Sequence, residues 1–380
     1  MTNLKQTRWS AGPGGSAAAG AAPGRVFPAA MKSAPGSVYE IDPLSDARWA
    51  ALVQNHPRSS VFHSSHWLGA LHAVYGYAPL ALTTSAPGSE VTNGFVFCGV
   101  NSWLTGRRFV SLPFSDHCEP LVDNSDQLDD MLLHIKQRVD DDNQKYIEIR
   151  PISYKPGAHT HLELSATYCF HELHLRGSLP EIFQSFHKDC VQRKIRRAER
   201  ENLRYEEGTS EKLLREFYRL LVMTRRRQGL PPQPIRWFRG LIAAFGKDLK
   251  IRVAFKGELA VAGILTLSFK KSMIYKYGCS DASFHNMGGT ALLFWNAIQE
   301  AKQSGFEELE MGRSDVDNLG LIAFKDHWGA KSTVIRYWSY PGGLTGPSEL
   351  WKKKLAKYVV PALPDYALVG VGRFLYPHIG

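Results

Sequence analysis

The sequence contains few cysteines, and none lies in a pattern typical of disulfide frameworks or zinc sites. Among the 380 residues there are five: Cys98, Cys118, Cys169, Cys190 and Cys279. Their number is odd and no Cys-x-x-Cys pair occurs, so neither a disulfide framework nor a zinc site is predicted. A reducing compartment fits this pattern, and we expect a cytoplasmic protein.

Long apolar segments are also absent. No uninterrupted apolar run approaches the ~20 residues that a membrane-spanning helix needs. Residues 1–37 are rich in Gly, Ala, Pro and Ser and lack a continuous apolar stretch, so we predict a flexible tail rather than a secretion signal. Met31 begins a more ordinary sequence and is expected to be the native start.

Several motifs that mark catalytic sites are missing. The sequence has no G-x-S-x-G, no G-x-x-x-x-G-K-[ST] and no H-E-x-x-H, which argues against hydrolase, nucleotidase and zincin chemistry. Three groups of polar residues do not complete a metal-ligand set at a recognised spacing: His159 with His161, His171 with His174, and Asp315, Asp317 with Asn318. We therefore expect no metal site and no tightly bound cofactor.

Acidic residues are outnumbered by basic ones. There are 46 Lys and Arg against 36 Asp and Glu, a formal net charge of +10. This surplus favours anionic partners such as nucleic acid, nucleotide-linked substrates or acidic lipid, without choosing among them. The remaining composition, 44% hydrophobic and 22% charged, is that of an ordinary globular protein.

The chain is long enough for two domains, and its patterns repeat. For residues 38–176 we predict helices at 46–55, 65–75 and 125–140, and strands at 79–84, 91–98, 107–112, 120–122, 145–149 and 168–175. For residues 177–342 we predict helices at 178–202, 210–228, 233–245 and 288–304, and strands at 249–255, 258–268, 271–278, 308–311 and 332–339. The shared order of helices, antiparallel strands, helix and strand suggests that one α/β fold is duplicated.

Residues 343–380 form a basic and apolar tail. Lys352, Lys353, Lys354 and Lys357 precede an apolar stretch that prolines interrupt. The tail is predicted either to contact a membrane surface peripherally, at its cytoplasmic face, or to dock on the protein's own surface.

The segment from Met311 to Gly329 is the strongest candidate for a functional site. A short strand enters a polar turn at Gly312, and a brief helical pattern then holds Phe324, Lys325 and Trp328. A lysine fixed on such an element offers positive charge to a phosphate or to the oxyanion of an acyl-transfer intermediate. A surface lysine beside two core aromatic residues would give the same pattern.

Two further segments could bind anions. Arg193, Arg197, Arg200 and Arg204 recur at helical spacing along one face, which fits either a phosphate site or a solvated basic surface. Gly288 and Gly289 precede a helix whose first backbone amides could bind an anion, although such glycines also occur in simple turns.

An ordered set of motifs resembles the FemAB-like proteins. The matching segments are Phe62-His-Ser-Ser-His-Trp-Leu68, Ser111-Leu-Pro-Phe-Ser115, Gln192-Arg-Lys-Ile-Arg-Arg-Ala198, Tyr275-Lys-Tyr-Gly-Cys-Ser280, and Gly312-Arg-Ser-Asp315 through Phe324-Lys-Asp-His-Trp-Gly329. The resemblance covers residues from about 41 to 340. It implies an α/β (α+β) fold of tandem GNAT-like domains, with mixed, mostly antiparallel sheets flanked by helices.

The resemblance also implies roles for individual residues. Lys325, beside Phe324, matches the lysine placed near the reacting acyl ester, and Tyr277 matches an active-site tyrosine. Arg193, Arg196 and Arg197 match a basic helix start that would bind substrate phosphates, and Arg313, Asp315 and Trp328 are further substrate-binding candidates. Gly288 and Gly289 match the pyrophosphate-binding loop of GNAT proteins, with His285 and Thr290 at its first and last positions.

The predicted function is therefore that of an N-acyltransferase. It would join a primary amine to an acyl group carried by acyl-CoA or aminoacyl-tRNA as co-substrate, in peptidoglycan or exopolysaccharide biosynthesis. The expected partners are an anionic or lipid-linked substrate and, for an aminoacyl donor, tRNA. The alternative is a non-catalytic GNAT-fold module that binds nucleic acid or anionic lipid.

Overall fold

One mixed sheet connects the residues that the structure describes, which are 37–157, 160–342 and 363–380 of the computed structural model. Its twelve strands follow the order β1-β2-β3-β4-β5-β12-β6-β11-β10-β9-β8-β7. Their bounds are β1 Tyr39–Ile41, β2 Ala78–Thr83, β3 Phe95–Ser102, β4 Gly106–Ser111, β5 Tyr146–Ile149, β6 Glu163–His174, β7 Arg204–Gly208, β8 Leu249–Lys256, β9 Leu259–Phe269, β10 Ser272–Ser280, β11 Glu308–Asp315 and β12 Lys331–Tyr340.

The order of elements repeats along the chain, as the sequence predicts. The first series is β1-α1-α2-β2-β3-β4-α3-β5 and the second is β7-α6-α7-β8-β9-β10-α8-β11. In each series the last strand pairs in parallel with the strand before its crossover helix, β4 with β5 and β10 with β11, while the other pairs are antiparallel. This is the mixed, mostly antiparallel α/β architecture that the resemblance implied.

The two series are joined by strands that cross between them. β12, late in the sequence, pairs with β5 of the first series and with β6. β6 pairs with β11 on its other side, although the predicted boundary at residue 176 assigns β6 to the first domain. The two-domain division stays a prediction, and the sheet runs across it.

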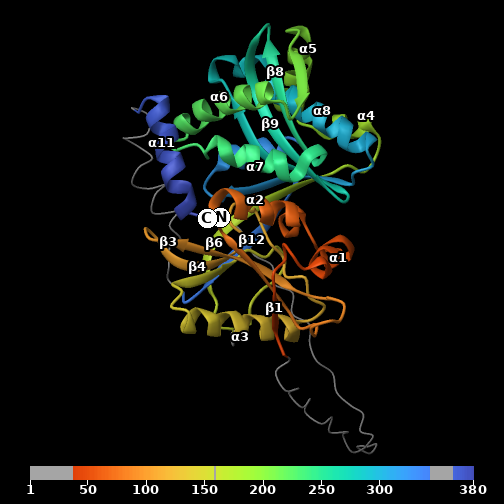
Figure 1. Ribbon diagram of the computed structural model, residues 1–380. Coiled ribbons are helices and arrows are strands. Elements are labelled where there is room, and N and C mark those ends of the chain that lie inside the picture. The colour runs from red at the N-terminus through yellow and green to blue at the C-terminus, as the bar shows by residue number, and fades with distance from the viewer. Residues whose placement is uncertain (1–36, 158–159, 343–362) are drawn as a thin grey trace, which may run out of the picture. The chain divides into compact units, whose positions relative to one another are not determined.

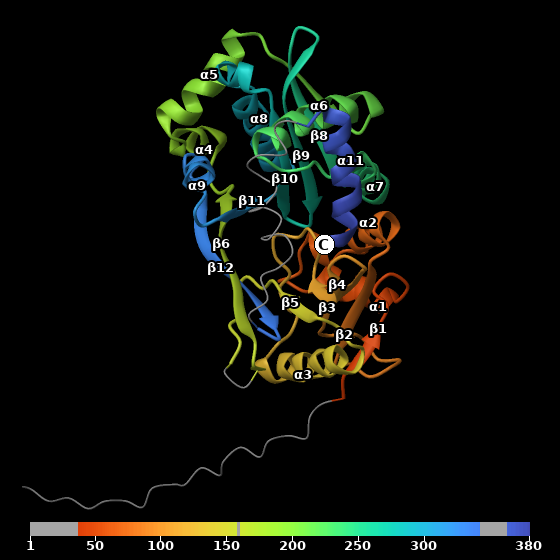
Figure 2. The same cartoon turned by 90° about the vertical axis from the view of Figure 1, so that its left-hand side faces the viewer.

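Helices cover both faces of the sheet (Figure 1). They are α1 Ala47–Asn55, α2 Ser65–Tyr75, α3 Ser125–Asp141, α4 Leu179–Ser185, α5 Arg193–Arg200, α6 Glu211–Arg227, α7 Ile235–Phe245, α8 Gly289–Gln303, α9 Leu319–Asp326 and α11 Asp365–Leu375. Figure 2 shows α6 and α7 on one side of β8 to β10 and α8 on the other. The helices α1, α2, α6 and α7 share one apolar core, in which Trp67 and Trp237 meet edge to face at 5.4 Å.

Two predicted elements differ from the structure. The single helix expected at residues 178–202 is divided into α4, a π-helical turn η3 (Lys188–Gln192) and α5. Ser178 and Glu181 form a capping box at α4, whereas Phe186 and His187 leave the helical conformation and His187 caps η3. The strand expected at 120–122 is reduced to one bridge between Gly94 and Leu121.

The last described residues dock on the folded core. Arg108 and Thr105 bind the carbonyl oxygen of His378, and Arg226 contacts Leu363 and Asp365. Tyr77 donates to the carbonyl of Tyr376. Lys352 to Lys354 and Lys357, on which a membrane contact was predicted, lie outside the described residues. No helix in the described part is long and apolar enough to cross a membrane.

Candidate active site

The parallel strands β10 and β11 separate part-way along their length. They pair only from Ser272 with Glu308 to Ile274 with Glu310. Directly after that point each strand has an extra residue opposite its other neighbour, Lys276 in β10 and Met311 in β11. Such β-bulges bend a strand and redirect its side chains. The opening between the strands is flanked by two adjoining pockets, both lined by Tyr275.

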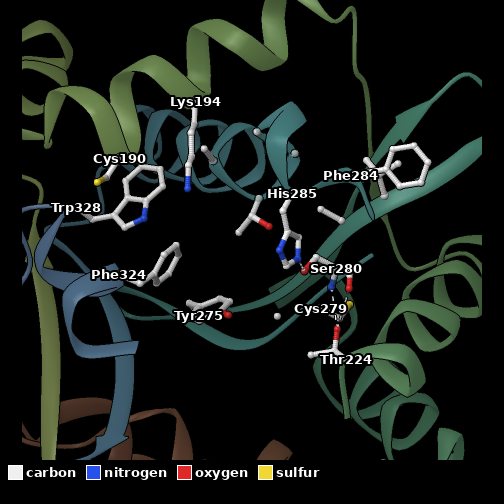
Figure 3. Close-up of a pocket in the computed structure, with 17 residues that line it drawn as sticks. Cys190, Lys194, Thr224, Tyr275, Cys279, Ser280, Phe284, His285, Phe324 and Trp328 are labelled. Atoms are coloured by element: carbon white, nitrogen blue, oxygen red, sulfur yellow. Dashed lines mark hydrogen bonds between the residues drawn. The ribbon is translucent and has the colours of Figure 1, made fainter. Parts of the chain in front are cut away.

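The first of these, the helix-start pocket, has a volume of about 300 Å³. It is lined by the start of α8, by β9 and β10, and by α9, with residues that include Lys194, Tyr275, His285, Gly288, Gly289, Phe324 and Trp328. In Figure 3, Lys194 and His285 point into it, and Tyr275, Phe324 and Trp328 also border it. Its lining thus combines polar and cationic side chains with aromatic ones.

Gly288 allows α8 to begin close to the backbone of α5. Its φ is +79°, and a Cβ there would lie 2.1 Å from the carbonyl oxygen of Lys194. The first backbone amides of this 15-residue helix have no partner within the helix, and they form the part of a helix that favours anions.

His285 lies beside these amides and bonds Ser280 at 2.8 Å. Burial lowers the pKa of His285, and the cationic Arg227 and Lys194 lower it further. Positive charge thus surrounds this imidazole, which is the environment that an anionic ligand would enter.

The second pocket, the lysine pocket, has a volume of about 630 Å³. Its charged and polar lining comes from four regions of the chain and comprises Asp116, Arg225, Gln228, Lys276, Arg313, Asp315, Asn318 and Lys325. The helix α9 serves both pockets, because Phe324 lines the first and the next residue, Lys325, lines the second.

Lys325 is almost completely buried, with 2% of its surface exposed. Its Nζ donates to the carbonyl oxygens of Gly312 at 2.7 Å and Arg313 at 3.1 Å. Burial lowers the pKa of Lys325 to about 8, and Lys276 and Arg313 act in the same direction against the carboxylate of Asp116. The lysine is thus a fixed donor whose charge is lost within a narrow range above neutral pH.

Asp116 interacts with two of the cationic side chains in the lysine pocket. It bonds Lys276 at 2.7 Å and lies 4.0 Å from Arg313. Burial alone would raise the pKa of Asp116, but Lys276 and Arg313 outweigh it and lower the pKa. Arg313 is held by the rings of Tyr168 and Tyr337, whose centroids lie 4.1 Å and 5.0 Å from its guanidinium carbon.

The next residue, His117, belongs to a separate acidic pocket. Its Nε2 lies 3.3 Å from Glu310, and the same pocket of about 580 Å³ is lined by Glu172. Burial, with Glu310 and Glu308 nearby, raises the pKa of Glu172 to about 7. Burial alone would lower the pKa of His117. The hydrogen bond to Glu310 and the negative charge of Glu310 outweigh burial and raise that pKa.

Several predicted site residues are brought together by the fold. Phe324, Trp328, Gly288 and Gly289 line the helix-start pocket, and Lys325, Arg313 and Asp315 line the lysine pocket. Their catalytic and binding roles stay predictions.

Tyr277 does not line either pocket. Lys276 is an extra residue in β10, so Tyr275 pairs with Thr266 and Tyr277 pairs with its direct neighbour Leu265. The two tyrosines therefore lie on opposite faces of the sheet. Tyr277 lies in the core under α7, where its hydroxyl accepts a hydrogen bond from Trp237 at 2.8 Å. Tyr275, two residues earlier, lines both pockets, and the catalytic role of Tyr277 stays a prediction.

The three predicted arginines also lie elsewhere. Arg193 and Arg197 are exposed and pair along their own helix with Asp189 and Glu201. Arg196 lies over the ring of Phe183. Lys194 is the basic residue of this helix that lines the helix-start pocket.

Sequence reasoning missed Asp116, Lys276, Tyr275 and Lys194. Asp116 directly follows the Ser111 to Ser115 motif, and Lys276 and Tyr275 lie within the Tyr275 to Ser280 motif, so a signal was present for these three. Nothing in the sequence distinguishes Lys194 from the arginines beside it.

The second half of the chain matches a known family. Residues 185–325 match the acetyltransferase (GNAT) domain. This segment has the GNAT fold. It contains η3, α5, the strands β8 to β11, the start of α8 and Lys325. Most of the lining of both pockets therefore lies in the matched segment, whereas Trp328 and Asp116 lie outside it.

Solved structures share the whole fold. FemX superposes with a TM-score of 0.61 at 14% identity, covering 80% of this chain and 97% of that chain. A tandem GNAT protein from the clavulanic acid biosynthesis pathway gives a TM-score of 0.51 at 11% identity, covering 80% of this chain and 98% of that chain. No curated protein matches the sequence. The tandem GNAT fold predicted from the FemAB-like motifs is confirmed.

Proposed function

We propose that this protein is an N-acyltransferase that forms an amide between a primary amine and an activated acyl group. The observation that carries the proposal is the position of α9, which places Phe324 in the helix-start pocket and the buried Lys325 in the adjoining one. A donor bound in the first pocket would present its acyl group at the opening where the second pocket begins.

The donor's phosphate fits the start of α8. Backbone amides at the helix start, with Lys194 beside them, form a cationic surface, and Tyr275, Phe324 and Trp328 form an aromatic wall for an apolar or ester-bearing arm. Both acyl-CoA and aminoacyl-tRNA carry a phosphate and an activated acyl group, and both are proposed as donors.

Lys325 would stabilise the oxyanion of the tetrahedral intermediate. An ammonium group has three N–H donors, and carbonyl oxygens of Gly312 and Arg313 take two of them. The third is left for a developing negative charge. Because the two carbonyls fix the ammonium beforehand, little reorganisation is needed when charge appears.

The acceptor would bind in the lysine pocket. Carboxylates of Asp116 and Asp315 suit a cationic amine, and Arg313 suits an anionic group on the same molecule. We propose an acceptor of the cell envelope, a peptidoglycan or exopolysaccharide precursor or a lipid-linked one, since the FemAB resemblance implies this class. The amine must lose a proton before it attacks, and the ester or thioester then breaks with release of the alcohol or thiol.

The test is a ligand screen followed by turnover. Acyl-CoAs, aminoacyl-tRNA and UDP-linked muropeptides would be compared for their effect on the melting temperature, because a ligand stabilises the folded state that binds it. Donors that stabilise would be incubated with amine acceptors and the products weighed by mass spectrometry.

The matched variants are Lys325→Met and Lys331→Met. Lys331 is exposed on β12 and lines neither pocket. We expect Lys325→Met to reduce turnover by roughly a hundredfold or more with little change in binding of the donor, as for removal of an oxyanion donor. Lys331→Met should retain activity. Equal turnover by wild type and Lys325→Met would remove Lys325 from the mechanism.

A further inference from the structure

Two histidines and a cysteine meet beside the helix-start pocket. Their potential ligand atoms, on His187, Cys190 and His327, all lie within 4.8 Å of one another. His187 and Cys190 belong to η3 and its cap, whereas His327 directly follows α9. The residues are far apart in the sequence, so no motif revealed them, and no metal site was predicted.

The backbone holds these three residues together without any ion. The amide of His187 donates to the carbonyl of His327 at 2.8 Å, and the two rings lie with centroids 4.6 Å apart. The backbone amide of His327 in turn donates a hydrogen bond to the carbonyl oxygen of Ala323 at 2.9 Å, which fixes His327. Such a preformed site avoids the ordering entropy that a flexible ligand set would lose.

The donor set has the chemistry of a zinc-type site. Imidazole nitrogen and thiolate sulfur bind Zn²⁺ at about 2.0–2.1 Å and 2.3 Å, which puts tetrahedral ligand atoms roughly 3.5 Å apart. The ligand atoms lie at most 4.8 Å apart. Side-chain rotations that move them by about an ångström would therefore bring them to the distances of a zinc site. Three protein ligands leave a fourth position for water or another ligand.

Two hydrogen bonds to His187 compete with metal binding. Nδ1 of His187 accepts hydrogen bonds from the amides of Asp189 and Cys190, each at 3.2 Å, the upper end of the normal range. A metal at Nδ1 would replace these bonds, and a metal at Nε2 would require the ring proton to move to Nδ1. Both bonds are long, so either change is minor beside the formation of metal–ligand bonds.

We propose that His187, Cys190 and His327 bind a borderline divalent transition-metal ion such as Zn²⁺. Binding converts the Cys190 thiol to a thiolate and releases its proton to solvent. The proposed site lies beside the helix-start pocket, since Cys190 lines that pocket and lies next to Trp328 in Figure 3. The inference does not depend on the proposed transferase function.

The ion would join two neighbouring segments that lead into the lining of the pocket. η3 leads into α5, which carries Lys194, and His327 follows α9, which carries Phe324 and Lys325. Binding should therefore raise the melting temperature, because an ion that binds only the folded protein stabilises it.

Cobalt is the probe, because Co²⁺ reports its ligands through its absorption spectrum. The reduced full-length chain, freed of metal with a chelator, would be titrated with Co²⁺. We expect one equivalent to bind, with a thiolate-to-cobalt charge-transfer band and ligand-field bands of tetrahedral intensity. Zn²⁺ should displace the cobalt and bleach both.

Variants assign the ligands. Cys190→Ser should abolish the charge-transfer band, and His327→Asn should weaken binding by more than the roughly 10- to 100-fold that loss of an outer-shell partner causes. Cys169→Ser is the matched control, since Cys169 is the other half-buried free cysteine, and should retain the full spectrum.

A measurement on the wild-type protein tests the proposal even if a variant fails to fold. One equivalent of Zn²⁺ should slow the alkylation of Cys190 by iodoacetamide, followed by peptide mass spectrometry. A charge-transfer band that persists in Cys190→Ser, or alkylation of Cys190 at the same rate with and without Zn²⁺, would overturn the proposal.

Discussion

Lys325 combines a buried position with a charge that is easily lost. Its environment lowers the pKa to about 8, so the ammonium is present below that pH and disappears above it. A lysine in water would keep its charge to about pH 10. The same burial that fixes the donor in place therefore limits the pH range over which it can act.

Turnover should consequently fall as the pH rises through about 8. The ascending limb at lower pH would reflect deprotonation of the acceptor amine, and the descending limb the loss of the Lys325 charge. Lys325→Arg keeps a charge at these pH values, so its residual activity should not decline through pH 8. Rates measured across the pH range for both proteins check this, and an identical descending limb in the arginine variant would contradict it.

Glu172 should make stability depend on pH in the opposite sense from an ordinary paired carboxylate. Its folded-state pKa, about 7, lies above the reference value of 4.5, so its favourable contribution is present at acid pH and is lost as the pH rises from about 4.5 to 7. Glu172→Gln should stabilise the protein at pH 8, on the order of 2–3 kcal/mol, and flatten that part of the profile.

Denaturant unfolding at pH 5 and pH 8 measures this difference. Glu258→Gln is the control, because the side chain of Glu258 is 91% exposed. Equal stabilities of wild type and Glu172→Gln at both pH values would show that the acidic pocket does not hold Glu172 protonated.

Gly288 is required for a close approach and not only for its backbone angle. Gly288 and Gly305 have nearly equal φ, +79° and +77°, but only at Gly288 would a Cβ meet a backbone oxygen, that of Lys194. We expect Gly305→Ala to cost about 1–2 kcal/mol from backbone strain, and Gly288→Ala to cost more and to weaken donor binding. Thermal unfolding and donor titration of the two variants would compare them, and equal losses would exclude the contact.

At the scale of elements, regular segments were predictable and irregular ones were not. Helices such as α3, α6 and α8 and strands such as β8 and β9 follow apolar patterns with clear starts and stops, and the structure has them close to the predicted bounds. The break between α4 and α5 was missed because the residues at the break, Phe186 and His187, include neither Pro nor Gly and give no stop signal. The carbonyl of His327, from a distant segment, bonds the chain at that break.

The residues of the site were likewise predictable only in part. Phe324, Lys325 and the two glycines could be found because they lie in motifs at element ends, where residue type and position agree. Tyr277 lines neither pocket because the bulge at Lys276 places it on the opposite face of the sheet from Tyr275, and a bulge leaves no mark in the alternation of residues. Lys194 could not be distinguished from Arg193, Arg196 and Arg197, since the sequence does not show which of these four basic side chains faces a pocket.

At the scale of the whole molecule, the two series of elements share their main core. Trp67 of α2 and Trp237 of α7 are completely buried against each other. This contact joins the halves more firmly than a linker would, so the described residues should unfold together.

Trp67→Ala should therefore lower the stability of both halves at once. Removal of a buried tryptophan costs about 3–5 kcal/mol, and we expect one transition at a lower denaturant concentration instead of two. Trp103→Ala, which removes a side chain that is 77% exposed, should change the midpoint little. Calorimetry with fluorescence would follow both variants, and a split into two transitions in Trp67→Ala would show that the halves are independent.

The position of β12 has a consequence for how the protein is made. This strand ends at Tyr340 yet occupies the middle of the sheet, between β5 and β6. While the ribosome is still translating earlier codons, β5 and β6 lack their shared neighbour and expose edges that other nascent chains could pair with. Completion of the sheet must wait until residues 331–340 have left the exit tunnel, so chaperone demand during synthesis is expected to be highest just before that point.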